Sequence, residues 1–254
     1  MIKAEHLTKS YGPFTALQDV SFEIQKGEIV GFLGANGAGK TTTMRILTGF
    51  YQPTSGKATV AGFSVADQAM DVKKRIGYLP ETPPVYPEMS VEAYLRFVLE
   101  LKLVPREKRK DLLEWALGKC GLSHRRNSII ATLSKGYRQR VGLAQAIIHK
   151  PPVIILDEPT VGLDPLQIIE IRNLIREFSG EHTVLLSTHI LSEVTAVCQR
   201  VIMIHRGRIV HDQQIKDMSA KRSLEELFLE VISKDPASLS DASSGNNNSK
   251  VSAG

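Results

Sequence analysis

Cysteine is scarce in this sequence, with Cys120 and Cys198 the two examples among 254 residues. They are far apart and lack the spacing of metal ligands, so we expect reduced thiols packed on helices. Long hydrophobic runs are also missing. The longest, at 153–156 and 201–204, are as long as strands and fall far below the roughly 20 apolar residues of a membrane-spanning helix. The chain is therefore not expected to span a membrane.

Aromatic residues make up 6% of the chain, and the basic clusters do not form the aromatic-rich face that binds nucleic acid. The net charge is +5, and clusters such as 106–110 also contain acidic residues. The simplest interpretation is a solvated surface, and the alternative is a patch that faces a membrane or a partner. No secretory leader opens the sequence, so we expect a cytoplasmic protein. Because the basic clusters lack an aromatic-rich face, we expect no nucleic acid partner.

Short apolar strands and helical segments alternate along most of the chain. Strands are expected near 2–7, 20–24, 29–33, 57–60, 153–156, 183–187 and 201–204. Such strands joined by helices predict an α/β fold with a mostly parallel sheet covered on both faces. A helical subdomain is expected at about 82–149, where Ser90 can cap one helix and Pro105 suits the first turn of another. Residues 233–254, rich in Ser, Asn and Gly, are expected to form a disordered tail.

A glycine-rich segment follows the apolar run at 29–33 and precedes a helical pattern. Its residues are Gly34, Ala35, Asn36, Gly37, Ala38, Gly39, Lys40 and Thr41. The glycines let successive backbone N–H groups point at phosphate oxygens, while Lys40 neutralises the outer phosphates and the Thr41 hydroxyl reaches Mg²⁺. A glycine-rich turn without a ligand is the alternative, but the flanking strand and helix favour a nucleoside triphosphate site.

Two carboxylates, Asp157 and Glu158, end the apolar strand at 153–156. The carboxyl ends of parallel strands form the ligand-binding edge of such a sheet. Asp157 is expected to hold the Mg²⁺ shell, and Glu158 is expected to orient or deprotonate the attacking water. Acidic pairs also cap helices, so this prediction depends on the phosphate loop.

A second anion site is predicted where a helix begins at 134. Ser134 is a natural N-cap, and the free backbone N–H groups of the first turn follow it. Most of a subdomain separates this site from the phosphate loop. Two anion sites in one chain suggest a ligand shared by two chains.

These segments together resemble the ATP-binding subunit of an ATP-binding-cassette (ABC) transporter over about residues 1–232. The order is the phosphate loop, 133–136, Asp157-Glu158, 162–165 and 187–189. The resemblance implies a P-loop NTPase (RecA-like) core with an N-terminal antiparallel β subdomain and an inserted helical subdomain. It also implies ATP and Mg²⁺ as cofactors, a head-to-tail dimer, and a membrane permease as partner.

The resemblance also assigns roles to individual residues. Tyr11 would stack on adenine, and residues from Gly34 to Thr42 would hold phosphates. Ser134 and Gly136 would contact the nucleotide of the partner subunit. Glu81 would stand where the family has a glutamine near Mg²⁺, Asp164 would communicate between the sites, and His189 would contact the terminal phosphate. From the residues alone, Tyr11 is equally a turn aromatic and His189 is more often structural.

Three positions depart from the pattern of the family. Glu81 puts a carboxylate in place of an amide, while Lys135 and Tyr137 replace the commoner glycine and glutamine. Within the family, the chain looks most like drug and polymer exporters, and there like the ATPases of gliding motility. In that branch Tyr94, Phe97 and Leu101 would line a groove for the membrane subunit, although their spacing also fits a plain core stripe.

The function predicted from the sequence is ATP hydrolysis by Lys40, Thr41, Asp157, Glu158 and His189, which drives a separate permease from the inner face of the membrane. The second ATP-binding subunit is expected to be another copy of the chain. One alternative is a non-transport ABC ATPase acting on ribosomes or nucleic acid, although neither a second cassette nor a long heptad insertion is present. The other is a regulatory module that binds ATP without turnover, which the presence of Glu158 argues against.

Overall fold

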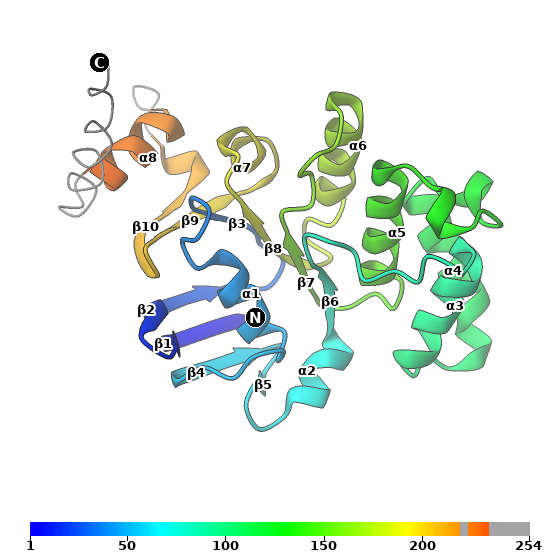
Figure 1. Cartoon of the computed structure of the whole chain (residues 1–254), viewed down its shortest axis with the longest axis horizontal. Coiled ribbons are helices and arrows are strands. Elements are labelled where there is room, and N and C mark those ends of the chain that lie inside the picture. The colour runs from blue at the N-terminus through cyan, green and yellow to red at the C-terminus, as the bar shows by residue number, and fades with distance from the viewer. Residues whose placement is uncertain (219–222, 234–254) are drawn as a thin grey trace, which may run out of the picture.

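The computed structural model describes residues 1–218 and 223–233, and two β-sheets with flanking helices form this part of the chain (Figure 1). The strands are β1 (Ile2–Tyr11), β2 (Phe14–Ile24), β3 (Ile29–Leu33), β4 (Ser55–Val60), β5 (Phe63–Ser64), β6 (Ile76–Leu79), β7 (Val153–Asp157), β8 (Thr183–Thr188), β9 (Arg200–His205) and β10 (Arg208–Gln214). The α-helices are α1 (Lys40–Leu47), α2 (Ala69–Arg75), α3 (Val91–Leu101), α4 (Arg106–Lys119), α5 (Lys135–Ile147), α6 (Pro165–Arg176), α7 (Leu191–Val197) and α8 (Leu224–Ser233). Apart from Ser233, the predicted tail at 233–254 lies outside the described residues.

The larger sheet has the strand order β10-β9-β3-β8-β7-β6. All its neighbouring pairs are parallel except β10 with β9. The predicted α/β fold is therefore confirmed. Strands β3, β8 and β7 are neighbours at the centre, and the segments that follow them carry Lys40, His189 and Glu158 respectively. Parallel pairing thus brings three distant parts of the sequence to one edge of the sheet.

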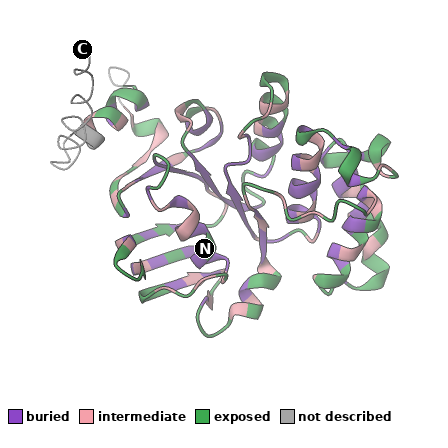
Figure 2. Ribbon diagram, viewed as in Figure 1, coloured by how far each residue is buried: buried purple, intermediate pink, exposed green. Residues whose placement is uncertain are grey.

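The central strands β3, β8 and β7 are buried on both faces, as the purple ribbon in Figure 2 shows. In β7, Val153 and Ile155 join the core under the N-terminal sheet, and Ile154 and Leu156 join the core on the opposite face. Successive side chains of a strand point to opposite sides of the sheet, and here both sides are apolar cores, so β7 has no polar face. A continuous apolar run was therefore the correct signal for a central strand.

The N-terminal sheet is antiparallel, with the order β2-β1-β4-β5. One core fills the space between it, α1 and the larger sheet. Within the described chain, helices α3, α4 and α5 form the helical subdomain at the right of Figure 1. Ser90 caps α3 as predicted, because its Oγ accepts a hydrogen bond from the N–H of Ala93 at 3.2 Å. Cys120 and Cys198 are buried free thiols, also as predicted.

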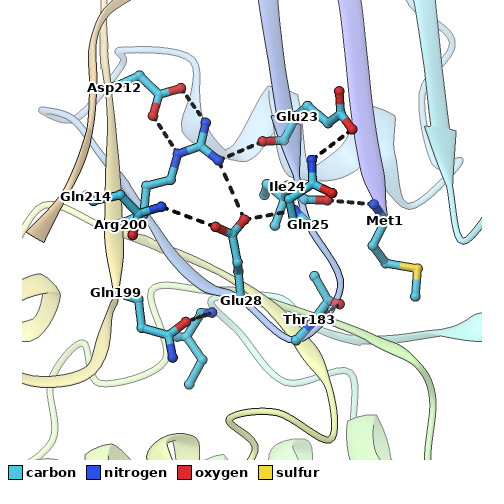
Figure 3. Close-up of polar contacts among 12 residues, drawn as sticks. Met1, Glu23, Ile24, Gln25, Glu28, Thr183, Gln199, Arg200, Asp212 and Gln214 are labelled. Carbon is cyan, nitrogen blue, oxygen red and sulfur yellow. Dashed lines mark hydrogen bonds and ion pairs between the residues drawn. The ribbon is translucent and has the colours of Figure 1, made fainter.

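A polar cluster, drawn in Figure 3, joins the two sheets near the start of β3, where Arg200 pairs with Val30. Arg200 on β9 donates to both carboxylate oxygens of Asp212 at 2.6 and 2.7 Å and to the backbone oxygen of Glu23 at 2.9 Å. Its guanidinium also lies 3.5 Å from Glu28. Glu28 in turn accepts from the N–H of Gln25 at 2.8 Å. Strands β2, β9 and β10 are thereby tied together where β3 begins.

Candidate active site

The phosphate loop lies between β3 and α1, and Gly39 ends it as the N-cap of α1. Gly39 has φ +109°, and a Cβ there would meet the backbone oxygen of Ala16 at 2.9 Å. Only glycine fits this conformation and this close approach. The sharp turn leaves the first N–H groups of α1 without helical partners, which is the arrangement that binds anions.

A cavity of about 570 Å³ opens beside this loop. It is lined by Phe14, Ala16, Asn36, Gly37, Gly39, Lys40, Thr41, Thr42, Glu81, Glu158, Val161 and His189. Most residues predicted to bind nucleotide therefore meet in one place. Gly34 and Ala38 belong to the loop but do not line the cavity.

Glu158 lies between two other predicted site residues. Its Oε1 is 3.2 Å from Nζ of Lys40, and its Oε2 is 2.9 Å from Nδ1 of His189. Glu158 has φ 50°, a left-handed conformation that is rare outside glycine and recurs at functional sites. Its backbone N–H donates to the oxygen of Ser187 at 3.1 Å, which fixes the turn after β7 against the end of β8.

Asp157 is buried at the end of β7 and precedes Glu158, which lines the cavity. Burial raises the pKa of its carboxyl group, and the nearby hydroxyl groups of Ser187 and Thr41 oppose this shift. Ser187 donates its hydroxyl to Oδ1. Oδ2 is buried and has no hydrogen-bond partner among the described residues. A buried carboxylate oxygen of this kind needs a cation or water.

These residues fit Mg²⁺. The ion takes oxygen ligands, and it is usually held by one or two carboxylates together with substrate phosphates. Asp157 and Thr41 supply suitable oxygens next to the phosphate loop. The described part of the chain has no cluster of three or more His, Cys, Asp or Glu side chains that could hold a metal. A divalent ion here would therefore depend on phosphate oxygens and water for its remaining ligands.

Ser134, Gly136 and Asp164 lie outside the cavity and form a second group. Ser134 and Asp164 are exposed N-caps of α5 and α6. The two helix starts pack closely, because a Cβ on Gly136 would collide with the side chain of Gln167. The helix start at which the second anion site is predicted is therefore present, and it lies apart from the cavity beside the phosphate loop.

The three departures from the family pattern have distinct surroundings. Glu81 lines both the cavity described above and a neighbouring one of about 400 Å³, which Lys135 also lines. The Lys135 side chain lies over Gly162, where a Cβ would collide with Nζ. Tyr137 is held by its own subdomain, since its hydroxyl lies 3.1 Å from Nε2 of His124.

An aromatic residue that was not predicted from the sequence, Phe14, lines the cavity and is 61% exposed. Tyr11 does not line it, and its ring packs edge-on against Tyr51 with centroids 6.0 Å apart. Tyr11 and Phe14 are cross-strand partners at the ends of the β1–β2 hairpin. This pairing is the signal that would have brought Phe14 into the prediction.

The residues expected to line a groove for the membrane subunit, Tyr94, Phe97 and Leu101, share one face of α3 by their spacing but differ in burial. Tyr94 is buried, Phe97 is partly buried, and Leu101 is 64% exposed. The core stripe of α3 is instead formed by Val91, Tyr94, Leu95, Val98 and Leu99. No helix in the described ranges is long and apolar enough to cross a membrane.

Comparison with known proteins gives consistent matches. The family model described as "ABC transporter" matches residues 17–161. The ABC transporter ATP-binding protein YhcH of Bacillus subtilis is 38% identical over 220 residues, which covers 85% of this chain and 71% of that protein. The bacitracin transport ATP-binding protein BcrA of Bacillus licheniformis is 37% identical over 214 residues, covering 84% of this chain and 69% of that protein.

Two solved structures are also similar. The ATP-binding subunit of an ABC transporter superposes with a TM-score of 0.83 at 32% identity, covering 91% of this chain and 99% of that one. The dimeric cassette MJ0796, in a post-hydrolysis state bound to ADP and Pi, has a TM-score of 0.79 at 25% identity. That comparison covers 86% of this chain and 100% of the MJ0796 chain.

Proposed function

This chain belongs to the ABC transporter family as an ATP-binding subunit and ATPase, and from this premise we propose how its residues perform the work. The observation that carries the proposal is the position of Glu158. It lies between Lys40 and His189, at 3.2 and 2.9 Å, on the wall of the cavity beside the phosphate loop. This arrangement suits phosphoryl transfer to water, which requires a fixed triphosphate and a positioned base.

Binding is the role of the loop and the start of α1. The N–H groups of the loop and of α1, together with Lys40, hold the β- and γ-phosphates. Asp157 and Thr41 would hold Mg²⁺. The bound ion would neutralise charge that develops on the phosphates.

Glu158 orients the attacking water and takes its proton. His189 fixes the orientation of that carboxylate and faces the terminal phosphate. A base acts only within hydrogen-bond reach of the proton it removes. The turns after β7 and β8, which place Glu158 and His189, therefore affect the rate in addition to the identity of the side chains.

The site is completed by a second copy of the chain. Ser134, Gly136 and Asp164 are grouped outside the cavity that Lys40 lines, and Ser134 and Asp164 are exposed. In a head-to-tail dimer, the α5 start of one subunit would face the phosphates bound by its partner. Binding of ATP closes this dimer and loss of the terminal phosphate opens it, because the nucleotide contributes contacts to both sides.

The motion is passed to an integral membrane permease, and the subunit sits at the inner face of the membrane through that contact. Outward transport is proposed, as the sequence motifs indicated. The named role of BcrA in bacitracin transport agrees with a transporter and argues against the soluble ribosome- or nucleic acid-directed alternative. The closer likeness to gliding-motility ATPases remains a prediction.

One preparation tests the proposal. The full chain, tagged and expressed in its own cells, is purified from detergent-solubilised membranes. We expect Mg-dependent ATP hydrolysis and one co-purifying protein with several membrane-spanning helices. Recovery of ribosomal proteins in place of a membrane protein would contradict the transport role. ATP binding without phosphate release would contradict the catalytic role.

A further inference from the structure

Glu193 on α7 is a buried carboxylate behind the active site, with 1% of its surface exposed. Both its oxygens accept hydrogen bonds from threonine hydroxyls. Thr188 donates to Oε2 at 2.6 Å, and Thr160 donates to Oε1. One side chain thus links the end of β8 with the segment after β7.

Each threonine belongs to a turn that carries a residue of the proposed mechanism. Thr188 precedes His189, and its hydroxyl oxygen also accepts from the N–H of Ile190 at 3.0 Å. Its backbone oxygen accepts from the N–H of Gly34 in the phosphate loop at 3.3 Å. The Glu193 contact therefore reaches a point where the phosphate loop and the His189 turn meet.

Thr160 follows Glu158 by two residues in the other turn. In that turn the N–H of Val161 donates to the backbone oxygen of Glu158 at 3.3 Å. The distance between the carboxylate of Glu158 and the ring of His189 depends on the spacing of these two turns. Glu193 bridges them on the side away from the cavity, where it does not line the nucleotide site.

The surroundings of Glu193 suit a carboxylate that accepts and does not react. Arg172 places Nη2 3.9 Å from Oε1. Burial raises the pKa of Glu193, while the hydrogen bond from Thr188 and the charge of Arg172 lower it. Hydrogen bonds to both oxygens and a nearby cation compensate the loss of hydration.

We propose that Glu193 is a positioning residue for ATP hydrolysis, which holds the Glu158 and His189 turns at the spacing that the reaction needs. This inference rests on the proposed function of the same site. Small displacements of a reacting group have large kinetic effects, so loss of the bridge affects kcat far more than nucleotide binding.

The test compares Glu193→Ala with Glu193→Gln and with the exposed control Glu177→Ala. We expect Glu193→Ala to lower kcat by about tenfold or more while the Kd for Mg·ADP stays within about twofold. Glu193→Gln keeps the shape of the side chain and one acceptor oxygen. Its amide N–H can donate to the hydroxyl oxygen of a threonine. It should recover most of the rate, and Glu177→Ala should leave kcat unchanged.

A second readout does not depend on turnover. The ring ¹⁵N resonances of His189, assigned by their loss in His189→Asn, should shift in Glu193→Ala and remain in place in Glu177→Ala. If Glu193→Ala fails to fold, Thr160→Val and Thr188→Val each remove one arm at nearly constant volume. Each should lower kcat and shift the same resonances.

Different results would overturn this inference and the proposed function. An inactive wild-type protein would overturn the proposed function. The His189 resonances would still show whether Glu193 positions the His189 ring. Unshifted His189 resonances would overturn the positioning role. So would an unchanged kcat, or a loss of Mg·ADP affinity as large as the loss of kcat, in an active enzyme.

Discussion

Lys40 and Glu158 form a buried ion pair, with Nζ 3.2 Å from Oε1. Lys40 also donates to the backbone oxygens of Gly34 and Ala35 at 2.8 and 3.1 Å. The ammonium group is therefore surrounded by oxygens of its own chain. In the proposed function, phosphate oxygens would compete with Glu158 for Lys40, which would link the binding of nucleotide to the position of the proposed base.

Replacing Glu158 by glutamine removes the base and weakens this competition. We expect Glu158→Gln to lower turnover by about 10²–10⁴-fold, the range for loss of a general base. Affinity for ATP should stay the same or increase, and a dimer should accumulate with Mg·ATP. Phosphate release and light scattering after size exclusion measure both effects.

The matched control for that variant is Glu81→Gln, a second carboxylate on the same cavity. It restores the amide that is usual in the family and should retain turnover. A Glu158→Gln protein that turns over like the wild type would refute the role as base. One that remains monomeric when saturated with Mg·ATP would refute the shared site.

Lys40→Ala tests the binding half of the same pair. Charge-assisted hydrogen bonds are worth about 1.5–3 kcal/mol, so ATP affinity should fall roughly 10- to 100-fold. The variant also leaves Glu158 buried without its cation, and the free energy of unfolding should decrease. Isothermal titration gives the affinity and urea denaturation gives the stability. Unchanged affinity would contradict the phosphate-loop assignment.

Phe14→Ala and Tyr11→Ala examine the aromatic corner of the site. Stacking of a base on an aromatic ring is worth about 1–3 kcal/mol. Because Phe14 lines the cavity, Phe14→Ala should weaken ATP binding by roughly tenfold, a loss within that energy range. Binding of inorganic triphosphate, which has no base, should be unaffected. Tyr11→Ala in parallel shows whether the predicted stacking residue acts with Phe14. Equal losses for ATP and triphosphate would place Phe14 away from the base.

These residues show what sequence could and could not predict. The phosphate loop is one unbroken stretch of sequence, and so is the Asp157-Glu158 strand end, so each could be predicted from its own residues. The parallel order of the strands then brings both segments close to His189. Phe14 depends instead on how β2 packs on the loop, through close approaches such as that of the Ala16 backbone oxygen, which would lie 2.9 Å from a Cβ on Gly39.

Glu193 was missed for a different reason. It lies on the same side of a short helix as Val197, and a single charge in an apolar pattern normally indicates the end of a buried face. Of its two threonine partners, Thr160 is distant in sequence. Thr188 is near in sequence, but a threonine at the end of a strand does not by itself indicate a buried carboxylate. Only the packing of α7 under both turns gives the carboxylate its position.

Arg200→Met should destabilise the chain without altering the active site. The cluster in Figure 3 is at the opposite end of β3 from the phosphate loop. Loss of the paired hydrogen bonds to Asp212 should lower the free energy of unfolding by about 2 kcal/mol, measured by urea denaturation. The more exposed pair of Arg96 and Glu92 is the control, and Arg96→Met should cost about 0.5 kcal/mol or less. Equal costs would show that the cluster does not stabilise the contact between the sheets.

His149 gives the chain a predictable sensitivity to acid. Its Nε2 lies 3.0 Å from the backbone oxygen of Ile76, and its Nδ1 is buried with no hydrogen-bond partner in the described part of the chain. Burial, together with the charge of Lys102, lowers the pKa of His149 from 6.5 to about 3. Between these values the unfolded chain binds a proton that the folded chain does not, so stability falls as pH decreases through the window.

The slope from this one group is at most about 1.4 kcal/mol per pH unit. His149→Gln keeps a donor for Ile76 and removes the titration. We therefore expect the free energy of unfolding of the wild type to fall more steeply than that of His149→Gln between pH 6.5 and 4.5, with the two curves parallel above pH 7.5. Urea denaturation at each pH provides the comparison. Parallel curves over the whole range would show that His149 titrates alike in the folded and unfolded chain.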